Sequence, residues 1–357
     1  MKKINFFYLS LVAGALFTLG ACNDKNDDVT PMPTLPDYVG FNILNEGSGL
    51  NSGLGFIKYG DFSYSDNVVN VGAGGNDLVS YGSKLYITAT DANKVIVVEA
   101  RTKKELETIQ LDGPRFLLPY KGDIYVTNGD NQLTKIDTAT YAKSSIEVGR
   151  SPEQLAATNG KIYVTNSGWK DAANSGYDNR ISVVNPNSFS VEKNITVAEN
   201  INTIAADTIK NMLYVNAAAI YNADNEITSE SKLYTVNISN DEVKPLTFGA
   251  EKICILATTT TAGSTVRIGY FISSNYTDGK QSCVMMSLDN QQTQTFATGL
   301  TAPYSIDMIP ELPVLVIGDA KDYSAKGTIN FYDYSSGQQL ANPVEVGVAP
   351  KKTVFTF

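Results

Sequence analysis

Histidine is absent from this chain of 357 residues. The absence excludes Ser-His-Asp and Cys-His nucleophile systems, a histidine general base and histidine-based metal sites. The sequence also contains no CxxC pair, no EF-hand-like Asp series and no Walker phosphate loop. Carboxylate pairs such as Asp319 and Asp322 remain candidates for acid/base chemistry, although Asp residues in turns commonly cap their own backbone. We therefore expect a protein that is not an enzyme and that carries no cofactor.

Positive charge is also scarce. The chain has 28 Lys and Arg residues against 37 Asp and Glu residues, which gives a formal net charge of −9, and it contains no basic tract. Proteins that bind nucleic acid need a Lys/Arg footprint for the phosphates. We expect no nucleic-acid partner.

A phrase of alternating Tyr, Ile, Val and Thr residues recurs along the chain. Residue types of this kind suit a pleated, half-buried strand, and the Asn, Asp and Gly residues that follow favour turns. Equivalent positions are separated by 38 to 56 residues, which is typical of propeller blades with four antiparallel strands. These positions are 43, 86, 125, 163, 214, 270 and 315. The sequence therefore predicts an all-β, seven-bladed β-propeller with four-stranded blades.

The two ends of the predicted domain favour ring closure. Residues 351–357 form one more strand, with no further blade behind it. We expect this strand to lie innermost in the first blade, whose other strands run near residues 39–44, 55–59 and 63–71. Such pairing of the C-terminal strand into the first blade holds the ring shut and leaves only short edges.

The amino terminus predicts export and lipid anchoring. Lys2 and Lys3 precede an apolar stretch, and Leu19-Gly20-Ala21-Cys22 resembles a lipobox, although an ordinary secretory signal or a membrane anchor is the alternative. We assign residues 1–21 to a lipoprotein signal peptide, residues 22–37 to a lipidated flexible tether that starts at Cys22, and residues 38–357 to the propeller. The acidic cluster after Cys22 resembles an export signal to the outer face of Gram-negative outer membranes. We expect attachment to the membrane through lipid only.

The other two cysteines predict no disulfide. Cys254 and Cys283 lie in apolar runs that correspond to the first and third strands of one blade. The intervening strand would hold them roughly 9–10 Å apart, whereas a disulfide needs Cα atoms within about 7 Å. We expect both thiols to be free, buried and inert.

Three long connections between second and third strands are expected on one face of the ring. They span residues 167–179 in the fourth blade, 217–231 in the fifth and 274–280 in the sixth. Long loops on a rigid scaffold are common places for binding sites. Together with the inter-blade connections and the matching loop of the seventh blade, they carry the candidate ligand-binding residues Arg115, Arg150, Trp169, Tyr221, Tyr276, Tyr304 and Tyr323.

Other residues near these loops have structural alternatives. The tyrosines at equivalent positions 86, 125, 163 and 214 are expected to pack between blades. Phe116 and Phe248 are as compatible with the core as with a site. Asn128 and Asn166 follow strands, where the closing of turns is favoured over contact with a ligand.

The intact phrases Tyr125–Asn128 and Tyr163–Asn166 resemble those of the YVTN-repeat propellers, which are often surface-layer or cell-surface proteins. The segment Ile43-Leu44-Asn45-Glu46-Gly47, after a lipobox and tether, is similar to propeller lipoproteins of gut anaerobes that include the BtuG-type corrinoid-binding lipoproteins. The resemblance covers the whole mature chain. It implies capture of a corrinoid such as cobalamin and its transfer to a TonB-dependent outer-membrane transporter.

The chemistry of the loops suits more than one ligand. A corrinoid needs aromatic contacts and many neutral hydrogen-bonding groups, and the absence of histidine means that no imidazole of the protein would replace a cobalt ligand. A surface glycan would also stack on aromatic rings, and a protein-interaction scaffold without a small ligand is a third reading. Asp137-Thr138-Ala139 and Asp207-Thr208-Ile209 further resemble a short O-glycosylation sequon of Gram-negative gut anaerobes.

Overall fold

The computed structural model describes residues 35–48, 51–259, 263–276, 279–309 and 311–357. The predicted signal peptide, Cys22 and the tether up to residue 34 lie outside the described residues. Those assignments stay predictions.

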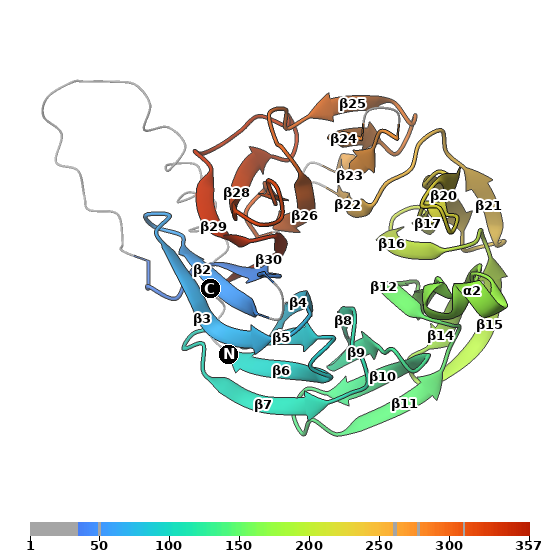
Figure 1. Cartoon of the computed structure of the whole chain (residues 1–357), viewed down its shortest axis with the longest axis horizontal. Coiled ribbons are helices and arrows are strands. Elements are labelled where there is room, and N and C mark those ends of the chain that lie inside the picture. The colour runs from blue at the N-terminus through green and yellow to red at the C-terminus, as the bar shows by residue number, and fades with distance from the viewer. Residues whose placement is uncertain (1–34, 49–50, 260–262, 277–278, 310) are drawn as a thin grey trace, which may run out of the picture.

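Seven four-stranded antiparallel sheets are arranged as blades around a central channel (Figure 1). Blades 1 to 3 consist of β30 (Pro350–Thr356), β1 (Gly40–Asn45), β2 (Ser52–Lys58) and β3 (Tyr64–Gly72); β4 (Gly75–Tyr81), β5 (Lys84–Ala89), β6 (Lys94–Glu99) and β7 (Glu105–Gln110); and β8 (Leu117–Tyr120), β9 (Asp123–Thr127), β10 (Gln132–Asp137) and β11 (Lys143–Glu147). The strands are given from the channel outward. The predicted seven-bladed β-propeller is confirmed.

Blades 4 to 7 follow the same order. They consist of β12 (Pro152–Thr158), β13 (Lys161–Asn166), β14 (Arg180–Asn185) and β15 (Ser190–Thr196); β16 (Ile201–Asp207), β17 (Met212–Ala217), β20 (Lys232–Asn237) and β21 (Glu242–Pro245); β22 (Lys252–Thr259), β23 (Thr265–Ser274), β24 (Gln281–Ser287) and β25 (Thr293–Phe296); and β26 (Pro303–Ile309), β27 (Val314–Asp319), β28 (Lys326–Asp333) and β29 (Val344–Val348). The long loops add a two-stranded hairpin, β18 (Ile220–Tyr221) with β19 (Ile227–Ser229), and short helical turns η1 (Trp169–Asp171) and α2 (Ala172–Ser175).

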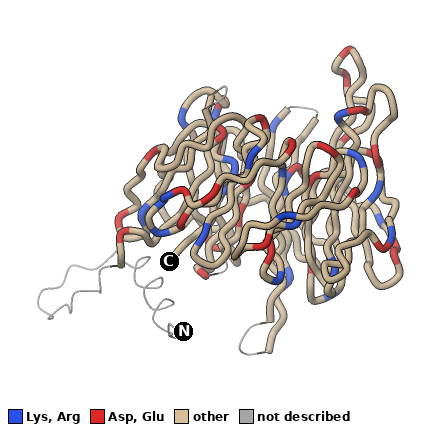
Figure 2. Tube along the Cα trace, turned by 90° about the horizontal axis from the view of Figure 1, so that it is seen from below, with Lys and Arg blue, Asp and Glu red and all other residues tan. Residues whose placement is uncertain are grey.

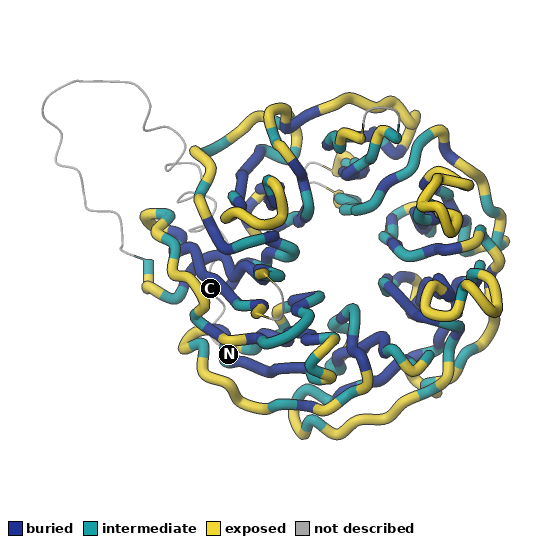
Figure 3. The backbone as a smooth tube through the Cα atoms, in the orientation of Figure 1, coloured by how far each residue is buried: buried dark blue, intermediate teal, exposed yellow. Residues whose placement is uncertain are grey.

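The repeated phrase forms the second strand of each blade, which is buried on both faces. Alternate side chains of a strand point to opposite faces, so one face packs on the preceding blade and the other on the following blade. In β5, Leu85 and Ile87 contact the core shared with blade 1, whereas Tyr86 contacts the core shared with blade 3. Tyr125 of β9 likewise faces blade 4. Figure 3 shows the buried residues within the blades and exposed residues along the outer rim. The tyrosines of the phrase are packing residues, as predicted.

Strand β30 closes the ring by pairing with β1. Phe41 lies opposite Phe355, and the Nδ2 of Asn42 donates to the Oγ1 of Thr356 at 2.9 Å. The ring of Phe355 lies 5.0 Å from that of Phe41 and 5.5 Å from that of Tyr59, measured between centroids. These contacts join the two ends of the propeller into one aromatic core, which confirms the predicted closure.

The two described cysteines lie on opposite sides of β23, as predicted. Cys254 in β22 is paired with Tyr270 of β23, and Cys283 in β24 is paired with Ile272 of the same strand. Both thiols are free. Burial raises the pKa of each to about 12, so both stay protonated and poorly nucleophilic at neutral pH.

Deletion of residues 351–357 should lower the melting temperature by at least about 10 °C, because it removes the clasp strand and the buried ring of Phe355. Differential scanning calorimetry measures this. Deletion of Phe357 alone is the matched control, since its side chain is 48% exposed. An unchanged melting temperature in the longer truncation would rule out closure by β30.

Candidate functional site

The predicted ligand-binding residues lie on the face formed by the long loops, and they separate into two groups. Arg115 and Trp169 come together over blades 3 and 4, at 5.5 Å between guanidinium and ring centroid. Tyr221, Tyr276, Tyr304 and Tyr323 line one cavity over blades 5, 6 and 7. We call the first group, with Phe116 and Glu153, the arginine–tryptophan cluster, and the second the tyrosine cavity.

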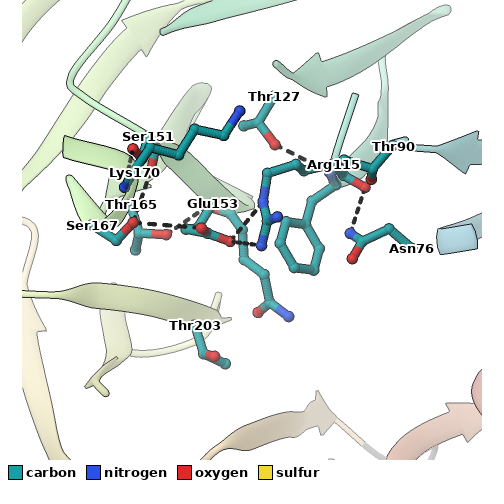
Figure 4. A network of polar contacts seen from close by, with 12 residues as sticks. Asn76, Thr90, Arg115, Thr127, Ser151, Glu153, Thr165, Ser167, Lys170 and Thr203 are labelled. Carbon is teal, nitrogen blue, oxygen red and sulfur yellow. Dashed lines mark hydrogen bonds and ion pairs between the residues drawn. The ribbon is translucent and has the colours of Figure 1, made fainter. Parts of the chain in front are cut away.

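Arg115 is held by a carboxylate that the sequence did not single out. It precedes β8 and points toward Glu153 of β12 in the neighbouring blade (Figure 4). Its Nη2 and Nε donate to Oε2 of Glu153 at 2.7 and 3.0 Å. The guanidinium lies 5.5 Å from the ring centroids of both Phe116 and Trp169. Arg115 is thus fixed between two aromatic rings by an ion pair.

Glu153 also holds Trp169 in place. The Glu153 residue is 3% exposed, and its carboxylate accepts hydrogen bonds from the Trp169 side chain and from Ser167. Burial raises the pKa of Glu153, while Arg115 favours its ionised form. Trp169 itself remains 46% exposed. The indole N–H is therefore occupied internally, and the face of the ring is what Trp169 offers to a ligand.

Arg150 positions a loop. Its Nη2 donates to the carbonyl oxygens of Ser175 and Gly176 at 3.3 and 3.0 Å. Its backbone N–H donates to Asp178, which also binds Arg180. These bonds hold the 167–179 connection, and with it Trp169, against the inter-blade loop.

The tyrosine cavity has a volume of about 300 Å³. Tyr304 and Tyr323 meet edge to face, with 5.3 Å between their ring centroids. Tyr221 and Tyr323 are each 48% exposed at the rim, and Tyr276 and Tyr304 are half-buried. The polar residues of the lining are Asn202, Asn216, Ser231, Glu251, Lys252 and Gln281. The cavity combines aromatic surface with amides and both signs of charge.

Hydrogen bonds to neighbouring residues fix the hydroxyl groups of Tyr276 and Tyr304. Tyr304 donates to a carboxylate oxygen of Glu46 at 2.5 Å, and Tyr276 bonds with Ser231. Burial raises the pKa of both phenols, and the hydrogen bond to Glu46 raises the pKa of Tyr304 further. Both hydroxyls therefore stay protonated at neutral pH.

A second cavity of about 200 Å³ occupies the central channel. Residues of all seven inner strands line it, among them Asp77 of β4, Asp307 of β26 and Lys352 of β30. Lys252 lines this cavity and the tyrosine cavity. The channel and the loop face thus meet at Lys252.

Several residues near the loops have structural roles, in hydrogen bonds within a blade or in packing, rather than free side chains on the loop face. The Nδ2 of Asn128 donates to Thr134 Oγ1 at 2.6 Å, and that of Asn166 to the Arg180 carbonyl at 2.9 Å. Phe248 packs on Phe271 at 5.4 Å between centroids, and so belongs to the core. Phe116 lines the channel.

The residues that sequence reasoning missed are Glu153, Asn202, Asn216, Glu251 and Lys252. Asn216 belongs to the repeated phrase, where it was indistinguishable from its turn-closing equivalents. Lys252 begins an inner strand, and its position at the channel depends on the exact strand register.

Asp319 and Asp322 serve as loop caps. Asp319 is fully buried and accepts bonds from the backbone N–H groups of Thr301 and Ala302 at 3.1 and 2.8 Å and from Lys321 Nζ at 2.7 Å. Asp322 accepts hydrogen bonds from the backbone N–H groups of Ser324 and Ala325. Within the described residues, no cluster of three Cys, Asp or Glu side chains is arranged to hold a metal ion.

The two sequon-like threonines differ in exposure. Thr208 is exposed, whereas the Thr138 hydroxyl donates to the carbonyl oxygen of Gly122 at 2.6 Å. If either is glycosylated, Thr208 is the more accessible.

Figure 2 shows acidic and basic residues interspersed along the chain. Among the described residues, no helix is both long and apolar enough to cross a membrane.

No protein-family model matches the chain, and no curated protein matches it. The resemblance to YVTN-repeat and corrinoid-binding propellers therefore stays a prediction.

Solved structures match the fold. The chain is similar to a putative 6-phosphogluconolactonase of Bacteroides fragilis, with 13% identity, TM-score 0.62 and coverage of 91% of this chain and 100% of that one. It is similar to hydrazine synthase of Kuenenia stuttgartiensis, with 16% identity, TM-score 0.58 and coverage of 78% and 88%. It is also similar to the Pan2 WD40 domain of Neurospora crassa, with 12% identity, TM-score 0.56 and coverage of 89% and 94%. At these identities the likeness shows the propeller fold alone, which serves enzymes and binding domains alike.

Replacement of Asp319 by Asn should lower the free energy of unfolding by about 3 kcal/mol at neutral pH, because a buried, bonded carboxylate loses its charge. Burial disfavours ionisation of Asp319, but the bonds from Lys321 and from backbone N–H groups outweigh it and lower the pKa of Asp319 below 3.8. The stabilisation is therefore present above that value and lost as the pH falls through the lower, folded-state value.

Urea unfolding of the wild type and the variant at pH 7 and pH 3 measures this. The difference between the two proteins should shrink at pH 3. Asp224→Asn, in an exposed loop, is the control and should be neutral at both pH values. A difference that grows in acid contradicts the assignment.

Proposed function

We propose that this protein is a lipid-anchored surface protein that captures a small nutrient on its long-loop face and passes it to an outer-membrane transporter. The observation that carries the proposal is the convergence of four tyrosines from three blades on one cavity. None of the four occupies a repeated tyrosine position that packs between blades, so the blade repeat does not account for an aromatic residue at any of them. Aromatic surface with a few directed polar groups is typical of small-molecule sites.

A corrinoid is the first ligand to test. The cavity, at about 300 Å³, lies at the lower end of the usual range for ligand sites. It suits one amide-bearing arm of a corrin ring, while the macrocycle would lie across the exposed rings of Tyr221, Tyr323 and Trp169. Asn202, Asn216 and Gln281 supply amide partners for the amide fringe of the ligand.

A surface glycan is the second candidate, and the size of the cavity favours it. A volume of about 300 Å³ accommodates one sugar ring. Sugar rings stack on aromatic faces, and their hydroxyls pair with amides and carboxylates. The exposed Trp169 ring would then contact a further sugar of an extended chain.

Replacement of Tyr221 or of Trp169 by Ala should each weaken binding of the cognate ligand about thirtyfold, or about 2 kcal/mol, because aromatic anchors dominate binding energy. Isothermal titration calorimetry with cobalamin and, in parallel, with a panel of oligosaccharides measures the affinities without depending on tryptophan fluorescence. Leu106→Ala is the control, an exposed apolar side chain on the outermost strand of blade 2. If both aromatic variants bind as tightly as the wild type, the capture surface lies elsewhere.

Replacement of Cys22 by Ser should abolish acylation and release the protein from the membrane fraction, because Cys22 is the expected acceptor of lipid. Metabolic labelling with a fatty acid measures the modification, and protease shaving of intact cells measures exposure on the outer face. Cys283→Ser is the control, since that thiol is buried in blade 6. Equal label in Cys22→Ser and wild type would refute the anchor.

A further inference from the structure

Lys252 stands apart from the other lysines of the channel. Lys351 Nζ pairs with Glu46 at 3.1 Å, and Lys352 Nζ pairs with Asp307 at 2.6 Å. Lys252 Nζ makes no ion pair or hydrogen bond with any described residue. It makes a cation–π contact with Tyr304, in which Nζ lies 5.6 Å from the ring centroid. A partly buried ammonium without a carboxylate partner lies where the two cavities meet.

The surroundings disfavour the charge on Lys252. Burial first, and then Lys351 and Lys352 of β30, lower the pKa of Lys252. Glu251, which precedes it, and Glu46, from the loop after β1, oppose this effect without cancelling it. An anion beside the ammonium would favour its charged form.

Asn216 supplies a second unpaired donor in the same cavity. The residue is fully buried. Its Oδ1 accepts bonds from the backbone N–H of Ala250 at 2.9 Å and from Ser231 Oγ at 3.0 Å, which fixes the orientation of the amide. Its Nδ2 has no partner among the described residues. The equivalent Asn128 and Asn166 leave an acceptor, their Oδ1, unpaired, so Asn216 differs from them in leaving a donor without a partner, and buried polar groups are normally hydrogen-bonded.

Comparison with blade 4 shows one side-chain partner of the equivalent asparagine that Asn216 lacks. In blade 4, the Nδ2 of Asn166 donates to Ser182, which lies opposite Val164 in the register of the blade. The corresponding position in blade 5, opposite Val215, is Tyr234, which makes no such bond. One of the three acceptors of Asn166 Nδ2, the Ser182 hydroxyl, is thus replaced in the blade that borders the tyrosine cavity; the other two are the carbonyl oxygens of Val164 and Arg180.

The remaining polar groups point to the rest of the ligand. The carboxylate of Glu251 already accepts bonds from Ser274 and from Gln281 Nε2. The Oδ1 of Asn202, which also lines the cavity, is buried without a partner among the described residues. Two donors and one acceptor are therefore free for a ligand.

We propose that Lys252 and Asn216 form an anion subsite in the tyrosine cavity, which takes a carboxylate or phosphate group of the captured nutrient. A ligand hydroxyl or N–H donates to Asn202, and the body of the ligand lies on the tyrosine rings. The inference deepens the proposed function and rests on it for the biological meaning of the site. An acidic sugar and a phosphoester-bearing molecule share this chemistry.

The test follows the Lys252 ammonium directly. The lysines of the full chain are dimethylated with ¹³C-formaldehyde, and the Lys252 signal is assigned by its absence in Lys252→Gln. The protein is titrated at constant ionic strength with inorganic phosphate, with glucuronate and, as the neutral control, with glucose. The signal should move saturably with at least one anion and stay unchanged with glucose. The anion should also raise the pKa of Lys252, so that binding weakens as the pH rises.

Calorimetry with the unmodified protein gives the second readout. Lys252→Gln and Asn216→Asp should each weaken binding of the active anion at least tenfold, because one removes the positive charge and the other adds a negative charge. Lys244→Gln is the control, since the Lys244 side chain is 65% exposed on the outermost strand of blade 5. Melting temperatures close to the wild-type value establish that the variants fold.

The possible outcomes separate the inference from the proposed function. Tighter binding of phosphate points to a phosphoester, and tighter binding of glucuronate points to an acidic sugar; either result supports the subsite. If neither anion moves the Lys252 signal, or if Lys252→Gln binds the anion as well as the wild type, the subsite is overturned. Capture of a neutral nutrient by the tyrosines would survive that result. If the anions bind but neither cobalamin nor any oligosaccharide does, the subsite stands and the proposed nutrients are wrong.

Discussion

The pairing of β30 with β1 is the constraint on which the rest of the structure depends. Each blade packs only against its two neighbours, and the pairing of β30 with β1 ties the end of the chain into the first blade beside the apolar core that blades 1 and 7 share. The aromatic core around Phe41 and Phe355 makes that junction as apolar as the junctions between consecutive blades. Because the ring is closed, loops that are distant in sequence are held around one channel, and Glu46 of blade 1 reaches Tyr304 of blade 7.

The long-loop face combines a rigid part with a receptive part. Around Glu153, the charged and aromatic side chains satisfy one another, and Arg115 fixes the exposed ring of Trp169 without needing a ligand. Over blades 5 to 7, the opposite holds: among the described residues, the Lys252 ammonium has no ion-pair partner and the Nδ2 of Asn216 has no acceptor, and both residues line the cavity of the four tyrosines. Buried donors that lack partners are costly unless a ligand or water completes them. This contrast is the reason to place the polar recognition groups in the tyrosine cavity, whereas the arginine–tryptophan cluster presents a fixed aromatic face to the ligand.

The sequence predicts the fold well because the phrase around Tyr86, Tyr125 and Tyr163 encodes the contact between adjacent blades. The long loops were likewise visible as insertions in the repeat, which brought Tyr221 and Tyr323 into view. Lys252 and Asn216 were not predictable, because nothing local distinguishes them. Lys252 matters through its place in the channel, and Asn216 through the substitution of Tyr234 across the sheet. Glu153 was missed for the same reason, since its partner Arg115 belongs to another blade.

Hydrogen exchange of the backbone amides of β30 tests the account most directly. If β30 is the inner strand of a closed first blade, its amides that bond to β1 should exchange only through global unfolding, as slowly as those of β9 in the middle of blade 3. Detachment of β30 from β1 would weaken the contact between blades 1 and 7 and separate the loops that form the binding face. Exchange in β30 that is much faster than in β9, at a rate typical of frayed termini, would contradict the closed ring and the cavity that depends on it.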